Sequence, residues 1–131
     1  MEEQRKNSYD PNEDIVDRMW KRSKNSINLV IVVCNILVFL AVTLTGGTES
    51  SRHMMDCGAA YAPLIESGEY YRLFTSMFLH FGIQHLINNM LLLLFLGDYL
   101  ERAVGKIRYQ VIYLGGGLVG NQCSYQHELS L

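Results

Sequence analysis

Three apolar blocks interrupt an otherwise polar chain of 131 residues, at about residues 27–44, 77–96 and 109–125. At roughly 1.5 Å per residue, the first two are just long enough to cross a hydrocarbon core as helices. The third is only weakly hydrophobic. The pattern predicts an all-α fold, a polytopic membrane helical bundle with three transmembrane helices. A chain of this length forms at most one domain, here a membrane domain at 27–131 after a polar segment at 1–26.

The polar segments between the blocks differ in character. In the N-terminal segment, the apolar spacing over residues 15–20 predicts a short amphipathic helix at the membrane surface. The segment from Thr45 to Gly68 is long for a simple connection between two helices, so we expect folded structure there. Residues 98–108 are rich in charge and are expected to form a short loop.

Lysine and arginine near the blocks predict the orientation, because cytoplasmic loops carry the excess of these residues. They gather before the first block and in the 98–108 loop, whereas the 45–76 loop holds only Arg52 and Arg72. The N-terminus is therefore expected in the cytoplasm and the 45–76 loop outside.

The central block carries polar side chains in its first two-thirds: His80, Gln84, His85, Asn88 and Asn89. Each is expensive in hydrocarbon, on the order of 1–3 kcal/mol, so such residues by default line a protected cavity or a site. His85 and Asn89 are four residues apart and lie on one face of a helix. An imidazole N–H and an amide N–H aimed at one oxygen would make an oxyanion hole. The alternative is that both bond neighbouring helices, as is also expected of Asn35.

Other chemistries receive little support from the sequence. On one continuous helix His80 and His85 would lie about 140° apart, which is poor for chelation. The three cysteines form no CxxC pair, so no metal and no other cofactor is expected. A net charge of −2 without a basic run argues against nucleic acid. Gly116 and Gly120 form a small-xxx-small pair and predict close packing of the third block against another helix.

The segment from Tyr70 to Asn121 resembles the core of the rhomboids, a family of intramembrane serine proteases. The residues that carry the resemblance are Arg72, Thr75, Phe78, His80, His85, Asn89, Gly97, Glu101, Gly105, Tyr109, Tyr113, Gly120 and Asn121. The resemblance implies a six-helix core in the lipid bilayer, with transmembrane proteins as substrates, cut near the outer membrane face. It also implies that His85 and Asn89 stabilise the oxyanion, that His80 supports them, and that Arg72 and Glu101 are structural.

The chain departs from this family pattern after Asn121. It contains neither the GxSG motif of the nucleophile nor a later helix with the base histidine. Ser124 has no glycine elbow and is not expected to replace the nucleophile. We therefore expect the N-terminal half of a bacterial-type rhomboid of the plasma membrane, truncated, poorly stable and inactive alone. The alternatives are an inactive binding module for membrane proteins and one half of a split protease that the missing C-terminal half completes.

Overall fold

A computed structural model describes residue 17 and residues 26–129, with side chains as far as residue 122. Within residues 26–129 every regular element is a helix. The amphipathic helix predicted over residues 15–20 lies outside the described residues except for Asp17, and the side chains of Ser124 and His127 also lie outside them.

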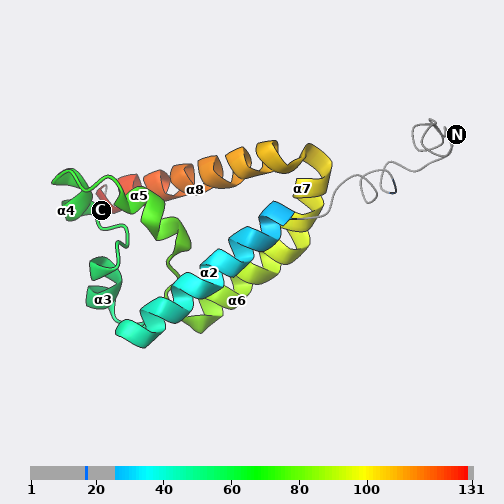
Figure 1. The fold of residues 1–131 in the computed structure, drawn as a ribbon. Coiled ribbons are helices and arrows are strands. Elements are labelled where there is room, and N and C mark those ends of the chain that lie inside the picture. The colour runs from blue at the N-terminus through cyan, green and yellow to red at the C-terminus, as the bar shows by residue number, and fades with distance from the viewer. Residues whose placement is uncertain (1–16, 18–25, 130–131) are drawn as a thin grey trace, which may run out of the picture.

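Two long helices pack side by side in antiparallel directions (Figure 1). Helix α2 spans Ser26–Thr45 and helix α6 spans Gly82–Leu92. Their shared core consists of Val32, Phe39, Leu86 and Met90. The other apolar side chains of the pair point outward, and Leu37 is 59% exposed. Such an outer surface suits a lipid environment better than water.

The central helix starts later and ends later than its apolar block. Ser76–Phe78 forms a 3₁₀ turn, η2, and the chain is extended at Phe81 before α6 begins at Gly82. The helix then continues through a π-helical turn, η3 (Leu93–Gly97), into α7 (Asp98–Val104). The continuous helix therefore covers residues 82–104, whereas the predicted span covers residues 77–96.

The charged loop predicted over residues 98–108 was wrong. Its first seven residues are helical, and Gly105 alone separates α7 from α8 (Lys106–Leu129). Charge ends an apolar span but does not end a helix, since Leu, Glu, Arg and Ala are all good helix formers. The stop is Gly105, whose φ of 87° and ψ of 161° form a conformation that is essentially restricted to glycine.

The hydropathy of these helices is consistent with one predicted span. By length and apolar composition, among the described residues, Ser26–Thr45 alone qualifies as a single helix that could cross a membrane. Arg72–Phe78 and Gly82–Val104 qualify only as a pair, bent by 85° at the break. Helix α8 is long enough but does not qualify, because glycines and polar residues dilute its apolar side chains.

The segment between the first two blocks is folded, as predicted. It contains helix α3 (Ser51–Asp56) and helix α4 (Ala62–Glu66), followed by α5 (Arg72–Thr75). His53 ties α3 to the end of α2, with its Nε2 atom 3.2 Å from the Val42 carbonyl oxygen. This segment is therefore not a slack linker.

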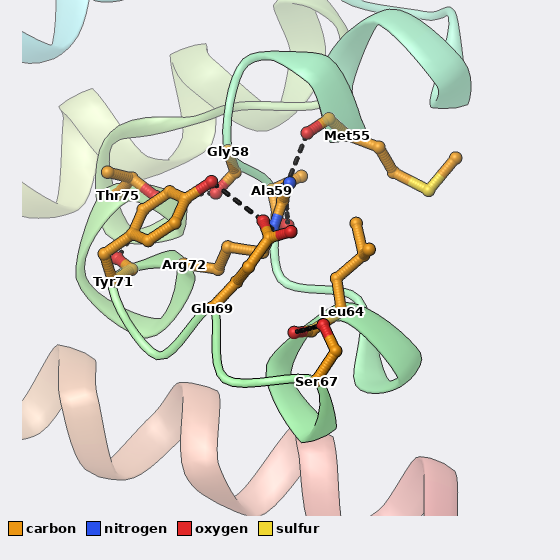
Figure 2. Close-up of polar contacts among 9 residues, drawn as sticks. All are labelled: Met55, Gly58, Ala59, Leu64, Ser67, Glu69, Tyr71, Arg72 and Thr75. Atoms are coloured by element: carbon orange, nitrogen blue, oxygen red, sulfur yellow. Dashed lines mark hydrogen bonds and ion pairs between the residues drawn. The ribbon is translucent and has the colours of Figure 1, made fainter.

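Arg72 holds the turns of this segment together (Figure 2). Its side chain is buried, and its guanidinium donates to the carbonyls of Met55 and Ala59 and to the Glu69 carboxylate. The hydrogen bond from the Tyr71 hydroxyl and the ion pair with Arg72 hold the pKa of Glu69 below its usual value. The same carboxylate raises the pKa of Tyr71.

Helix α8 runs away from the α2–α6 pair; its start is joined to α2, and its far end is joined to α5 and η2 (Figure 1). Near its start, the Tyr109 hydroxyl donates to the Asn28 side chain at 2.7 Å. Near its end, Asn121 donates to the Leu73 carbonyl and to the Ser76 hydroxyl, both at 2.8 Å. Between these two contacts the helices diverge.

Candidate functional site

A cavity of about 590 Å³ lies between helix α8 and the α2–α6 pair. Its walls are mainly leucine and glycine, with a few polar side chains among them. The polar residues that line it are Asn35, Ser76, His80, His85, Asn89, Tyr109, Tyr113 and Asn121. An apolar cavity with a small number of convergent polar groups is the usual form of a binding or active site.

His80 and His85 meet at this cavity. The predicted angle of about 140° between them assumed that both lie on one continuous helix. This assumption was wrong, because His80 precedes the start of the helix at Gly82. Their rings pack edge to face with centroids 5.3 Å apart. His80 is buried, and its Nδ1 lies 3.2 Å from the Phe78 carbonyl oxygen. Since a carbonyl only accepts, Nδ1 carries a proton and holds the ring in place.

The other polar residues of the central helix separate into two groups. Asn89 lines the cavity, and its amide donates to the backbone carbonyl of His85 at 2.9 Å. Gln84 and Asn88 are exposed and hydrogen-bond each other at 3.1 Å. Three of the five polar residues singled out from the sequence therefore share the cavity, and two do not.

Glu101 lies in α7, near the other end of the central helix, and is fully buried. Its carboxylate accepts from the backbone N–H groups of Ile27 and Asn28 at 3.0 and 2.7 Å. These are orphan donors in the first turn of α2, where the helix dipole also favours a negative charge. Glu101, near the C-terminal end of the central helix, thus caps the N-terminus of α2.

Asn28 completes this buried network. Its amide donates to the Leu93 carbonyl at 2.7 Å, and its side-chain oxygen accepts from Tyr109. The Leu93 carbonyl belongs to the π-helical turn, where the regular ladder of backbone hydrogen bonds is disturbed. One asparagine therefore links three helices.

The glycines of α8 pack differently from the prediction. Outside the backbone of α8 itself, no atom of the described residues lies within 4 Å of a Cβ placed on Gly116 or Gly120. No other helix of the described part of the chain therefore packs against these two glycines. Gly117 is the packed one, against the end of the Met77 side chain. The predicted close approach of a helix at Gly116 and Gly120 therefore has no counterpart in the described residues, and both glycines face the cavity instead.

Sequence reasoning missed the roles of Asn28, Tyr109 and Asn121, each of which joins its own helix to at least one other. A polar residue at the edge of an apolar block is a weak signal, because it is equally typical of a side chain that reaches water. Among the described residues no group of three or more metal-ligating side chains occurs.

Known proteins match the part of the chain that builds this site. The model of the rhomboid domain family matches residues 67–130. The chain belongs to the rhomboid family. It is 33% identical over 107 residues to the rhomboid protease GluP of Bacillus subtilis, covering 82% of this chain and 21% of GluP.

Two further relatives extend the comparison of this rhomboid segment. The putative rhomboid protease YdcA of Bacillus subtilis is 38% identical over 73 residues, which are 56% of this chain and 37% of YdcA. The inactive RHOMBOID-like protein 8 of Arabidopsis thaliana is 39% identical over 64 residues, 49% of this chain and 18% of that protein. The chain thus spans well under half the length of these relatives. No solved structure matches it.

Proposed function

We propose that this chain contributes the oxyanion-stabilising part of an intramembrane serine endopeptidase. In this proposal α2, the bent central segment and α8 are three spans of the six-helix rhomboid core. His85 and Asn89 donate to the tetrahedral oxyanion, and His80 supports them. The observation that carries the proposal is that these three side chains line one apolar cavity.

The hydrogen bonding of the three residues supports these roles. Asn89 donates only to the preceding turn of its own helix, a local bond that a rotation of the side chain can exchange for a bond to substrate. His80 is fixed by the Phe78 carbonyl and presents its ring to His85, which limits the orientations of the His85 imidazole. Donors held in place in an apolar cavity stabilise developing charge more strongly than donors in water.

The 131 residues contain neither a GxSG motif nor a later helix with a base histidine, so the proposal assigns the nucleophile and its base to none of these residues. We expect that the purified polypeptide does not cleave a transmembrane substrate by itself. Cleavage that Ser124→Ala abolishes would contradict this. The substrates proposed are transmembrane proteins, cut near the outer membrane face, with the N-terminus of the chain in the cytoplasm.

A chimera tests the oxyanion role. Residues 25–131 of this chain replace the matching segment of GluP, so that the protein includes the rest of a rhomboid domain. Removal of one oxyanion donor lowers kcat by about 10²–10³ in well-studied serine proteases. We expect His85→Ala and Asn89→Ala to lower cleavage of a reconstituted transmembrane substrate by that order, with little change in thermal unfolding.

Asn88→Ala is the matched control. Asn88 is the same residue type on the same turn, but it is exposed and pairs with Gln84 outside the cavity. Its substitution is expected to change cleavage less than about twofold, as for a surface substitution. Equal losses for Asn88→Ala and Asn89→Ala would overturn the proposal, as would full activity of Asn89→Ala.

A second candidate is a rhomboid-like module that binds transmembrane helices without cutting them. It is favoured by the likeness to a relative named inactive. It predicts that specific single-span membrane proteins co-purify with the chain, and that changes in the central helix abolish the association. It further predicts that the chimera binds substrate but shows no dependence of cleavage on His85.

A further inference from the structure

Asn35 has an unusual environment on the wall of the cavity. Its side chain is fully buried, and its amide nitrogen donates to the Ile31 carbonyl at 2.8 Å and to the Tyr113 hydroxyl at 3.3 Å. Its oxygen Oδ1 has no hydrogen-bond partner, and it is the only such buried side-chain atom among the described residues. Leaving a buried acceptor unpaired costs about 1–3 kcal/mol. A donor that is absent from these residues would remove this cost.

Asn35 lies at the depth of the proposed oxyanion donors. Asn28 contacts Leu93, and from this contact Asn35 lies about 10 Å along α2 by helix rise. From the same contact Asn89 and His85 lie about 6 and 12 Å along the antiparallel central helix. Asn35 and Tyr113 therefore face the cavity in the same layer as His85 and Asn89.

The α8 wall of the cavity has the shape that a helix backbone requires. Tyr113, Gly116 and Gly120 are three and four residues apart and lie on one face of α8. The two glycines leave open space, and the tyrosine hydroxyl is half-buried between α8 and α2. Small residues at this spacing let two membrane helices approach closely, and a polar side chain beside them supplies a hydrogen bond.

We propose that Asn35 and Tyr113 are a receptor for a serine or threonine hydroxyl on a membrane-spanning helix that occupies the cavity. That helix places small residues against Gly116 and Gly120, and its hydroxyl donates to Asn35 Oδ1. The contact holds the helix at the depth of His85 and Asn89. The proposal rests on the proposed function, because it concerns the helix that completes the same site.

The occupant is a further helix of the rhomboid domain rather than a substrate helix. The cavity is bounded at both ends by contacts inside the fold, Tyr109 with Asn28 and Asn121 with Ser76, which suits a resident element. The matched relatives are also much longer than this chain, whose match covers 37% of YdcA.

Designed peptides test the receptor with the full chain in lipid nanodiscs. Three labelled transmembrane peptides share one sequence except on one face: small residues with a central serine, small residues with alanine in its place, and leucines throughout. Interhelical hydrogen bonds in membranes contribute up to about 1.7 kcal/mol, so the serine peptide is expected to bind about 3- to 15-fold more tightly than the alanine peptide. The leucine peptide is expected to bind weakest.

Variants of the chain identify the receptor. Asn35→Leu, which is close to isosteric, is expected to reduce the serine-to-alanine ratio to about one, and Tyr113→Phe to lower it in part. Thr43→Val is the matched control, because it removes a hydroxyl from the same helix that bonds its own turn outside the cavity. If Asn35→Leu does not give a monodisperse helical protein, Tyr113→Phe carries the test.

A ratio of one in the unsubstituted chain would overturn the inference, and so would a ratio that survives in Asn35→Leu. Equal binding of the leucine peptide, or no binding of any peptide, would also overturn it, since lipid or water would then fill the cavity. A substrate helix as the occupant would appear as serine-dependent binding that a cleavable substrate helix displaces at equal concentration. The readout is binding, so a failure here leaves the effect of His85→Ala on cleavage intact, and the two proposals fail separately.

Discussion

At Gly97 side chains of two other helices come close to the backbone of the central helix. A Cβ placed there would lie 2.5 Å from the Asn28 side-chain oxygen and 2.7 Å from the Tyr109 hydroxyl. These atoms are hydrogen-bonded to each other and buried, so they cannot move aside without losing that bond. The absence of a side chain at this position is what allows Asn28 and Tyr109 to meet.

We expect Gly97→Ala to lower the free energy of unfolding by about 1–3 kcal/mol, the usual cost of overpacking a tight site. Gly115→Ala is the control, because nothing lies within 4 Å of a Cβ there and alanine favours a helix by about 0.5–1 kcal/mol. Denaturation of both variants in detergent, followed by circular dichroism, measures the difference. An equal effect of the two substitutions would show that the contact at Gly97 is not tight.

Among single residues, the sequence predicted the side chains that line the cavity better than the buried hydrogen bonds of Asn28 and Tyr109 near Gly97. His85 and Asn89 were found because polar residues in an apolar block demand an explanation. The contact between His80 and His85 could not be predicted, since it depends on a break in the helix before Gly82. The role of Gly97 depends on two residues more than 10 positions away and leaves no local signal.

The central helix shows how far an element can extend beyond its apolar block. Its uninterrupted apolar block ends at Leu96, yet the helix continues through Val104 to the glycine stop. The extension carries Glu101 to the start of α2, where it caps two backbone N–H groups. An apolar pattern predicts where a helix meets lipid, and capping residues decide where it ends.

Glu101→Gln keeps the shape of this cap but replaces one accepting oxygen with a donor. The new N–H₂ group faces a backbone N–H of α2 and leaves one of the two buried donors unpaired. We expect a loss of about 1–3 kcal/mol in the free energy of unfolding. Hydrogen exchange should show the loss first at the beginning of α2.

Glu66→Gln is the control for the loss of a charge, because Glu66 is exposed. Its effect is expected within about 0.5 kcal/mol. A Glu101→Gln protein as stable as the Glu66→Gln protein would show that the buried cap does not stabilise α2.

The helices of residues 26–129 form a wedge whose two arms are α8 and the α2–α6 pair (Figure 1). Tyr109 bonds the arms together at the narrow end, and Asn121 bonds the far end of α8 to α5 and η2. The apolar pattern predicted the three helices, and the weak hydropathy of the third predicted its unusual character. It could not predict that α8 stands away from the pair over its glycines. Helix α8 bonds to α2 through Tyr109 and Tyr113, whereas its far end bonds to α5 and η2 rather than to the α2–α6 pair.

Asn121→Ala tests the contact at the open end of the wedge. The substitution removes two hydrogen bonds, to Leu73 and Ser76, each worth about 0.5–1.5 kcal/mol. Backbone amides of residues 72–79 are expected to exchange about 5- to 10-fold faster, measured by mass spectrometry, with α2 unchanged. Asn88→Ala is the matched control, and unchanged exchange at residues 72–79 in Asn121→Ala would contradict the role.

The π-helical turn at Leu93–Gly97 sets the angular phase of the central helix. On an unbroken α-helix, about 100° per residue would carry Gly97 roughly 80° around the axis from Asn89. The π-helical turn contains one extra residue, which reduces this rotation about the helix axis by about 100°. Gly97 and Glu101 therefore lie within some 20° of Asn89 around the axis. A single added residue thereby places the capping carboxylate of Glu101 and the cavity-lining amide of Asn89 on one side of the central helix, and its deletion would turn one away from the other.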